Sequence, residues 1–270
     1  VLNSLKSSME GYVFHNQPLD TDDLLEQTVK LFNSCKTSLE LFDMLHNMRA
    51  YDDSTYAHSL NVALICRRIG KWLKVDAATL DTLTLCGLLH DIGKLKIPDE
   101  ILNKPGKYTD EEFDLVKRHT KFGYELLKTL NIDPHIKKAA LLHHERCDGS
   151  GYPLKATQKD LDDLSMVVAI ADVYDAMTAA RSYRAPLCPF QVIERFEQEG
   201  LQKYKPKFIL TFLQHIASTY QNNRVLLSNG QSANIVMLNQ QHLARPIVQL
   251  NDNSCIDLST RLDLHIQSIL

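Results

Sequence analysis

The sequence predicts a mainly α-helical protein with a small β-rich C-terminal appendage. Apolar residues recur at helical spacing through most of the first 220 residues. Residues that favour helix starts stand before several of these stretches. After about residue 221 the pattern changes to short β-type runs separated by turn residues. The 270 residues are enough for one large helical domain and a small second region.

Residues 1–50 form the predicted N-terminal helical segment. Thr21 is the expected N-cap of one helix, because Asp22 and Asp23 follow it and suit the positive end of a helix dipole. Apolar residues then recur at helical spacing from Leu24 to Cys35 and again from Leu39 to Met48.

Residues 51–220 form the predicted central domain, which is also helical. Thr109 and Glu112 make a capping box, so a helix is expected to begin there. A loop is expected around Lys104-Pro105-Gly106, where proline and glycine interrupt the pattern. The other helices are expected near residues 54–74, 76–92, 121–130, 134–146, 160–180, 189–199 and 206–220.

Residues 221–270 form the predicted β-rich appendage. Asn229-Gly230 separates two apolar runs and is a strong signal for a hairpin. The runs 247–250 and 255–258, with a polar turn between them, predict a second hairpin. The aspartates of this region are scattered, so no metal site is expected there.

Composition excludes some classes of function. The net charge of −3 disfavours a strongly basic binder of DNA or RNA duplexes. No apolar run approaches the roughly 18–20 residues of a membrane span, and no signal-peptide pattern is present. The six cysteines include no C-x-x-C pair, which favours reduced thiols and a cytoplasmic location.

Histidines and aspartates gather in the central domain. His90-Asp91 ends a leucine-rich helix, where a negative charge is unfavourable and a buried carboxylate is costly unless it is paired. A metal ion would remove both costs, whereas local pairing of Asp91 is the simpler alternative. His143-His144 is weak evidence alone, because adjacent side chains on a helix diverge by about 100°.

The combination is more informative than any one pair. Imidazole and carboxylate groups together suit Mn, Fe, Zn and related divalent ions, and a shared carboxylate is typical of a centre with two ions. The successive helices supply seven such groups: His58, His90, Asp91, His119, His143, His144 and Asp172.

These residues are similar to the HD-GYP group of the HD superfamily of metal-dependent phosphohydrolases. The run from His90 to Lys94 resembles the HD signature, and the run from His143 to Pro153 resembles the HHE-x-x-DG-x-GYP motif in full. Residues 97–106, His119 with Gly123, and the segment 172–184 also fit, so the resemblance covers about residues 50–220.

The resemblance implies an HD-type helical bundle with cyclic-di-GMP phosphodiesterase activity. It implies hydrolysis to pGpG by a hydroxide that a binuclear centre activates, with Fe or Mn as the favoured ions. His58, His90, Asp91 and Asp172 would hold one ion, while Asp91, His119, His143 and His144 would hold the other. The division between the two ions is less well defined by the motif than the set of seven residues.

Further roles also follow from the resemblance. Asp91 and Lys94 are the implied catalytic residues. Asp175 and Asp148 would support the metal ligands from outside the coordination sphere. The implied substrate contacts are Lys94, Tyr152, Arg181 and Arg184.

One position departs from part of the family. Some members have a glutamate four residues before the first histidine, where it helps hold a third metal ion. Ser54 stands there in this chain. We therefore expect two ions, with the reaction ending at the linear dinucleotide pGpG.

Other functions remain open from the sequence. The chain would be a cyclic-dinucleotide-sensing interaction module if it binds without turnover, or a phosphodiesterase for another cyclic dinucleotide such as 3′,3′-cGAMP. A (p)ppGpp hydrolase fits worse, because Ile92-Gly93-Lys94 follows the HD pair instead of the expected acidic residues. The partner classes left open, besides the cyclic dinucleotide, are a second copy of the chain as a homodimer and GGDEF-type signalling proteins.

Overall fold

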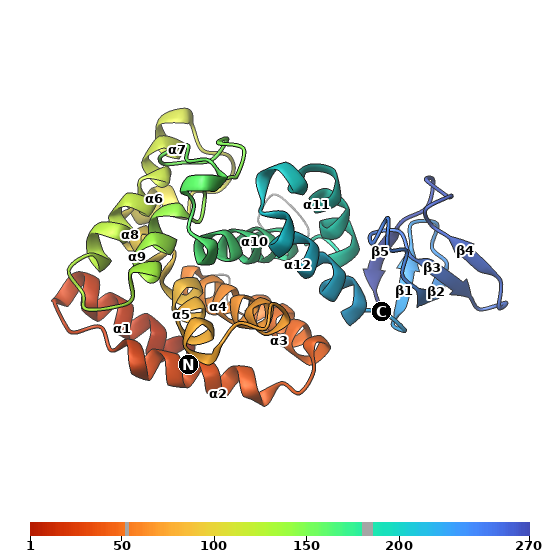
Figure 1. Ribbon diagram of the computed structural model, residues 1–270, viewed down its shortest axis with the longest axis horizontal. Helices are drawn as coiled ribbons and strands as arrows, with labels where there is room; N and C mark the ends of the chain where they lie inside the picture. Colours follow the sequence, from red (N-terminus) through yellow and green to blue (C-terminus); the bar gives the residue numbers. More distant parts are fainter. Residues whose placement is uncertain (52–53, 180–185) are drawn as a thin grey trace. The chain divides into compact units, whose positions relative to one another are not determined.

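The computed structural model describes residues 1–51, 54–179 and 186–270 (Figure 1). The chain divides into two compact units, Val1–Ala185 and Pro186–Leu270. Helices dominate the described residues, and the only strands among them form a small antiparallel sheet near the C-terminus. The predicted fold class, a helical bundle with a β-rich appendage, is confirmed.

The first unit consists of helices and the loops that join them. None of the helices in the described part of the chain is long and apolar enough to cross a membrane. The helices are α1 (Leu2–His15), α2 (Thr21–Ser34), α3 (Ser38–Tyr51), α4 (Thr55–Trp72), α5 (Ala77–Leu89), α6 (Asp99–Leu102), α7 (Asp110–Lys117), α8 (His119–Leu127), α9 (Pro134–Leu142) and α10 (Asp163–Thr178), with the 3₁₀ helices η1 (Ile92–Lys96) and η2 (Gln158–Asp160).

The helix starts follow local side-chain chemistry. The capping box at Thr109 is confirmed: its hydroxyl accepts from the backbone N–H of Glu112, and the Glu112 carboxylate accepts from the N–H of Thr109. The predicted N-cap Thr21 is wrong by one position. Asp20 caps α2 instead by accepting from the N–H of Asp23 at 3.0 Å, which leaves Thr21 as the first helical residue.

The core of the first unit lies around α4 and α5. These helices are buried over most of their length, and α10 packs against both of them and against α9. The leucines of α5 are buried, but they are not confined to one face of the helix. A helix that is buried on most sides does not need an apolar stripe, so the apolar residues of α5 show only weak helical periodicity. The first turn of α4, the C-terminal ends of α5 and α9 and the interior of α10 are thereby held close together.

Two helices end earlier than the sequence pattern suggested. The helix expected over 76–92 ends at Leu89, with His90 as its C-cap, and the chain then continues as η1. The helix expected over 134–146 ends at Leu142, with His143 as its C-cap. In both cases the helix ends at a histidine. The residue that follows, Asp91 or His144, therefore does not have to point about 100° away from that histidine, as it would inside a helix.

The second unit combines two helices with a five-stranded antiparallel sheet of order β4-β3-β2-β1-β5. Residue 220, where the sequence places the domain boundary, lies between α12 and β1 inside this unit, and that boundary stays a prediction. The elements are α11 (Pro189–Lys203), α12 (Pro206–Thr219), β1 (Arg224–Leu227), β2 (Ser232–Met237), β3 (Ile247–Leu250), β4 (Cys255–Asp257) and β5 (Ile266–Ile269).

Both predicted hairpins are present. β1 pairs with β2 across the Asn229-Gly230 turn, and β3 pairs with β4. β5 was not predicted from the sequence, and it pairs with β1 in a register that places Val225 opposite Ile269. No hairpin turn precedes β5, because its partner is the distant first strand, and so the local signal used for the other strands is absent.

Arg245 is expected to stabilise the second unit. Its guanidinium donates to Glu194 Oε1 from Nη2 at 2.7 Å and from Nε at 3.1 Å, and to the carbonyl of Leu264 from Nη1 at 3.0 Å. Because Arg245→Ala leaves a partly buried carboxylate without these donors, we expect a loss of about 1–3 kcal/mol in opening free energy, measured by hydrogen exchange of the strand amides.

Arg261→Ala is the matched control for that change. Arg261 also makes two hydrogen bonds to one carboxylate, that of Asp263, but both side chains are more than half exposed. Solvent-exposed pairs of this kind contribute little to stability. Equal protection losses in the two variants would contradict the role given to Arg245.

Candidate metal centre

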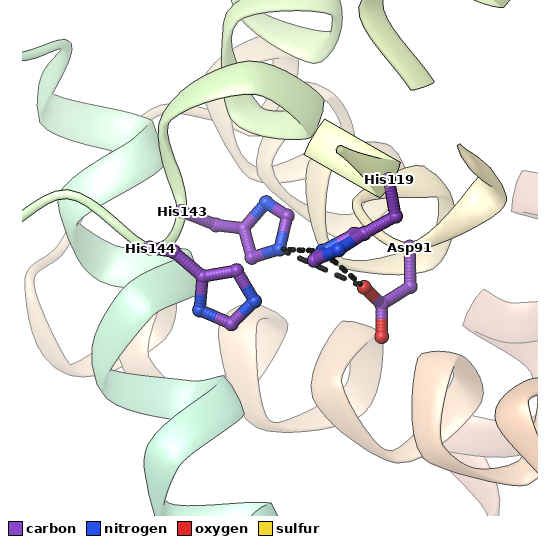
Figure 2. A group of neighbouring side chains, drawn as sticks. All are labelled: Asp91, His119, His143 and His144. Carbon is purple, nitrogen blue, oxygen red and sulfur yellow. Dashed lines mark hydrogen bonds and ion pairs between the residues drawn. The ribbon is translucent and has the colours of Figure 1, made fainter. Parts of the chain in front are cut away.

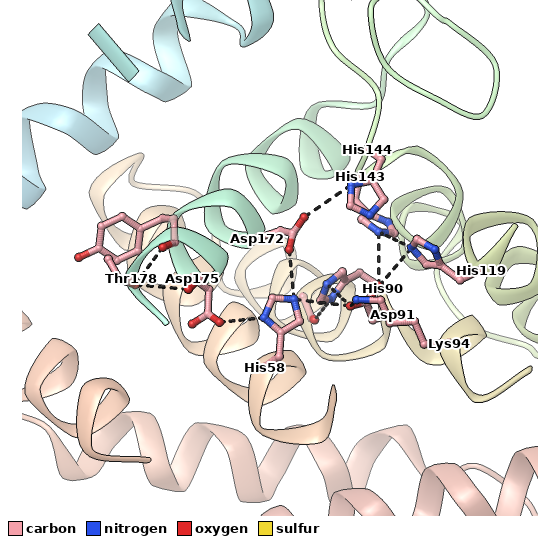
Figure 3. A network of polar contacts seen from close by, with 12 residues as sticks. His58, His90, Asp91, Lys94, His119, His143, His144, Asp172, Asp175 and Thr178 are labelled. Atoms are coloured by element: carbon pink, nitrogen blue, oxygen red, sulfur yellow. Dashed lines mark hydrogen bonds and ion pairs between the residues drawn. The ribbon is translucent and has the colours of Figure 1, made fainter. Parts of the chain in front are cut away.

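All seven residues predicted as metal ligands lie together in the first unit (Figure 3). The first turn of α4 supplies one histidine, and α8 supplies another at its first residue. The segments that follow α5 and α9 each supply an adjacent pair, and α10 supplies an aspartate. In that order they are His58, His119, His90 with Asp91, His143 with His144, and Asp172.

One oxygen of Asp91 faces the histidines of α8 and of the segment after α9 (Figure 2). Asp91 Oδ1 lies 3.3 Å from His119 Nε2 and 3.6 Å from His143 Nε2. The two nitrogen atoms are themselves 3.3 Å apart. His144 completes this group of four potential ligands, each of which can offer one atom to a common ion.

The other oxygen of Asp91 faces a different pair of histidines. Asp91 Oδ2 lies 3.3 Å from His90 Nε2 and 3.5 Å from His58 Nε2. Asp172 Oδ1 lies 3.1 Å from the same His58 nitrogen, while its Oδ2 lies 3.7 Å from His144 Nδ1. Asp91 therefore stands between two groups of potential ligands, and Asp172 lies beside both.

Backbone carbonyls determine which nitrogen of three imidazoles carries the proton. Nδ1 of His90 lies 2.7 Å from the carbonyl of Gly87, and the corresponding distances are 2.6 Å from His119 to Val116 and 2.8 Å from His143 to Ala139. A carbonyl only accepts, so each Nδ1 must donate. In the neutral rings Nε2 then carries a lone pair, and that atom faces Asp91.

Asp175 determines which nitrogen of the fourth imidazole, that of His58, carries the proton. Its Oδ2 lies 2.8 Å from His58 Nδ1, so the carboxylate accepts from that nitrogen and leaves Nε2 as the acceptor. Asp175 is buried, and it lies one helical turn after Asp172 on α10. The supporting role expected for Asp175 outside the coordination sphere stays a prediction.

The cluster fits divalent metal ions. Lone-pair nitrogens and carboxylate oxygens repel one another unless a cation lies between them, and His90 Nε2 and Asp91 Oδ1 are buried without a hydrogen-bond partner among the described residues. Two ligand atoms that are each about 2.1 Å from an ion lie about 3.0–3.4 Å apart, which is close to the spacing found around Asp91. Neutral imidazoles and carboxylates suit Fe, Mn, Zn and similar ions.

The electrostatics favour the protonation states that a metal requires. Burial acts to raise the pKa of Asp91, but the charges of Lys94 and His90 outweigh it and hold that pKa well below its ordinary value. Burial lowers the pKa of His143 to about 4 and lowers that of His144 well below its ordinary value. The ionised form of Asp91 and the neutral forms of His143 and His144 are therefore favoured near neutral pH. At His90 burial acts to lower the pKa, but the charge of Asp91 outweighs it and raises that pKa.

Lys94 lies beside the shared carboxylate. Its ammonium is 2.5 Å from Asp91 Oδ2, and the side chain is 21% exposed. The 3₁₀ geometry of η1 brings residues three apart to the same side, which explains how Lys94 reaches Asp91. The ammonium is thus a partly exposed positive charge beside the buried cluster.

The loop after α9 covers His144. The ring of Tyr152 stacks on that of His144 with centroids 4.7 Å apart and an interplanar angle of 29°. A Cβ at Gly151 would lie 2.4 Å from Glu145 Cα and 2.5 Å from the carbonyl oxygen of His144. Only glycine allows the loop to return this closely and place Tyr152 against the metal-binding cluster.

The remaining predicted residues are Asp148, Arg181 and Arg184. Asp148 accepts from the N–H of Ser150 at 2.9 Å and from its hydroxyl at 2.6 Å, contacts that shape the turn before Gly151. Arg181 and Arg184 lie outside the described residues.

Glu145 was not among the predicted site residues. It is 2% exposed, and its two carboxylate oxygens accept from the N–H groups of Leu154 at 2.6 Å and Ala156 at 3.0 Å. The signal in the sequence was its place directly after His143-His144. A charged residue in an otherwise apolar environment needs partners, and here the loop that carries Tyr152 supplies them.

Glu145→Ala is expected to loosen that loop. The change leaves two amide groups without an acceptor, so we expect a loss of about 1–3 kcal/mol in stability. Faster hydrogen exchange at the amides of Leu154 and Ala156 would show the local effect. Glu145→Gln keeps one acceptor oxygen and should give an intermediate rate, whereas unchanged exchange in both variants would contradict the role of Glu145.

A family model for the HD domain matches residues 23–208, which is more than half of the chain. The chain belongs to the HD domain family. The HD pair of this domain is His90-Asp91, the pair whose carboxylate lies at the centre of the cluster. The sequence resemblance to the HD-GYP group is confirmed by this match and by the named relatives of the chain.

Curated relatives of this HD domain protein are phosphodiesterases. It is 33% identical over 207 residues to a cyclic di-GMP phosphodiesterase of Pseudomonas aeruginosa, with 76% of this chain and 50% of the relative covered. It is 34% identical over 183 residues to 3′3′-cGAMP-specific phosphodiesterase 2 of Vibrio cholerae, with 67% and 35% covered. The HD domain chain therefore spans half or less of the length of these relatives.

A solved structure shares the fold of this HD domain protein. It is an HDG"Y"P protein from Bdellovibrio bacteriovorus, matched with a TM-score of 0.64 at 20% identity. The match covers 80% of this chain and 68% of that chain. The likeness supports the helical architecture found here.

Proposed function

We propose that this HD domain chain is a metal-dependent cyclic-di-GMP phosphodiesterase that produces pGpG. The observation that carries the proposal is the position of Asp91, whose two oxygens face separate groups of histidines. A shared carboxylate of this kind is typical of two-metal sites that hydrolyse phosphate esters. Relatives that act on cyclic di-GMP support the choice of substrate.

Two ions, Fe or Mn, are proposed for the cluster. His58, His90, Asp91 and Asp172 would hold one, and Asp91, His119, His143 and His144 would hold the other. When bound, such ions supply an activated water and positive charge against the phosphodiester oxygens. The reaction forms a bond from the water oxygen to phosphorus and breaks the bond from phosphorus to the ribose 3′ oxygen, which takes up the proton.

The chain's own residues would bind and orient the substrate. Lys94 carries an ammonium at the cluster and would hold a phosphate oxygen. Tyr152 would contact a guanine base, because its ring lies against a proposed metal ligand. Asp175 would orient His58, and Asp148 would shape the loop before Tyr152. Arg181 and Arg184 remain proposed substrate contacts on the ground of the motif alone.

The proposed number of ions rests on Ser54. Its hydroxyl accepts from the N–H of Ala57 at 3.3 Å and caps α4, four residues before His58. A hydroxyl is a poorer ligand for these ions than the glutamate that some relatives have at this position. Metal analysis after anaerobic purification should find two ions per chain, and three would overturn this part of the proposal.

The activity is tested by turnover. The anaerobically purified protein, loaded with Fe or Mn, is incubated with cyclic di-GMP under reducing conditions, and the products are separated by chromatography. Accumulation of pGpG is the expected result. Binding of cyclic di-GMP without product in any metal form would instead support the sensing module, and GMP as the end product would contradict the proposed stop at pGpG.

A second substrate is favoured by one relative. The Vibrio cholerae phosphodiesterase that is 34% identical to this chain is named as specific for 3′3′-cGAMP. The same assay with 3′3′-cGAMP therefore belongs beside that with cyclic di-GMP. A higher kcat/KM for 3′3′-cGAMP would replace cyclic di-GMP as the preferred substrate while keeping the reaction class.

A further inference from the structure

Phe113 on α7 is an exposed aromatic residue next to the candidate site. Its side chain is 45% exposed, although a phenylalanine of this size usually buries most of its surface. It lies outside the HD pair and the HHE-x-x-DG-x-GYP segment that define the cluster. The proposed metal centre alone therefore does not explain why a large aromatic side chain is exposed at this position.

A row of rings joins Phe113 to the cluster. The ring of Phe113 meets that of Tyr152 edge to face, with centroids 6.4 Å apart and an interplanar angle of 78°. Tyr152 in turn stacks on His144. The row begins at a proposed metal ligand and ends at an aromatic ring that solvent reaches.

A cation lies over the outer ring of this row. Nζ of Lys117 is 4.9 Å from the centroid of the Phe113 ring and also pairs with the carboxylate of Asp114. Lys117 lies one turn after Phe113 on α7, so the same helix presents an aromatic surface and a positive charge. A nucleotide offers the complementary pair of features, a flat base and an anionic phosphate.

We propose that Phe113 is a stacking platform for a purine base of the substrate, with Lys117 beside it. The inference rests on the proposed function for its substrate class and adds a binding residue from outside the motif. One phosphodiester would lie at the metal cluster, while a base attached to the same dinucleotide would stack on Phe113. Phe113 would thereby contribute to substrate affinity without touching the reacting phosphate.

Phe113→Ala should raise KM more than it changes kcat. Base stacking on an aromatic ring is worth enough that its loss should raise KM for cyclic di-GMP roughly 5- to 100-fold. Inhibition by GMP, which carries a purine, should weaken in parallel. Inhibition by inorganic phosphate and the metal content per chain should stay at the wild-type level, because both depend on the cluster alone.

Phe14→Ala is the matched control. Phe14 on α1 is also an exposed phenylalanine, at 55%, and it also lies under a lysine, Lys96, at 5.7 Å. In Figure 1 α1 and α7 lie at different ends of the first unit. Phe14→Ala should leave KM for cyclic di-GMP and inhibition by GMP unchanged.

Phe113→Trp tests stacking directly. A larger ring should keep KM near the wild-type value, and its fluorescence should be quenched when GMP is added. The chain contains one other tryptophan, so Phe14→Trp provides the background signal and should show no additional quenching. A structural role for Phe113 would not produce a quenching signal that depends on the purine.

The outcomes separate this inference from the proposed function. If the wild type hydrolyses cyclic di-GMP but Phe113→Ala leaves KM and GMP inhibition unchanged, the platform is wrong and the function stands. If no cyclic dinucleotide is hydrolysed, the proposed function is wrong. Calorimetry of GMP and phosphate binding to the metal-loaded protein then tests whether Phe113 is a stacking platform. Weaker GMP binding in Phe113→Ala alone supports it; equal or absent GMP binding overturns it.

Discussion

Asp91→Asn is expected to abolish binding of both proposed metal ions and, with them, the proposed turnover. The carboxylate is 1% exposed and offers one oxygen to each group of histidines. An asparagine keeps the shape but replaces one oxygen by an N–H donor and removes the negative charge. Loss of a residue that only orients a ligand costs about 10- to 100-fold in metal affinity, and loss of a shared ligand should cost more.

The measurement is metal content per chain, with turnover of cyclic di-GMP as a second readout. Asp22→Asn, an exposed position in the first turn of α2, is the control and should retain both ions. Circular dichroism would show whether the helical fold persists in Asp91→Asn. A variant that folds and retains two ions would contradict the shared position of Asp91.

Gly93→Ala is expected to displace α8 and weaken binding of the ion proposed at His119. A Cβ at Gly93 would lie 2.0 Å from the carbonyl oxygen of His119 and 2.4 Å from the backbone nitrogen of Gly123. Backbone atoms cannot rotate away as a flexible side chain would, so η1 and α8 must separate. We expect a stability loss of about 1–3 kcal/mol from overpacking, together with loss of metal from the histidines of this group.

Gly200→Ala in α11 is the matched control. Its added Cβ would meet the nearest heavy atom at 3.4 Å, an ordinary van der Waals contact. The substitution should therefore be neutral or slightly stabilising, because alanine favours a helix more than glycine does. Urea unfolding and metal analysis of both variants give the test, and full metal content in Gly93→Ala would show that η1 and α8 need not approach this closely.

Much of the architecture followed from the sequence, because helical periodicity, caps and turn residues act between near neighbours in the chain. The capping box at Thr109 and the Asn229-Gly230 hairpin are examples. The helix ends were less predictable. The sequence carries no glycine or proline directly after Leu89 or Leu142 to mark the helix ends, and the structure ends the helices there, with His90 and His143 as C-caps. β5 was missed because its partner lies far along the chain.

The candidate site shows the same division. Histidines and aspartates in a recognisable order indicated the type of chemistry, since those side chains are the ones that bind divalent metals. Their order could not reveal which oxygen of Asp91 faces which imidazole, or that Glu145 accepts from the loop carrying Tyr152. Those contacts join segments that are far apart in the sequence. They depend on how closely the helices that carry these segments approach one another.

The sequence by itself determined the class of fold, the family and the set of residues that are proposed to hold metal. Only the tertiary structure decided how these groups divide around Asp91, why Gly93 and Gly151 must lack a side chain, and that Phe113 lies against Tyr152. The physical reason is that residue type and periodicity specify chemistry and helix faces, whereas the separation between two helices is set by the packing of side chains from both.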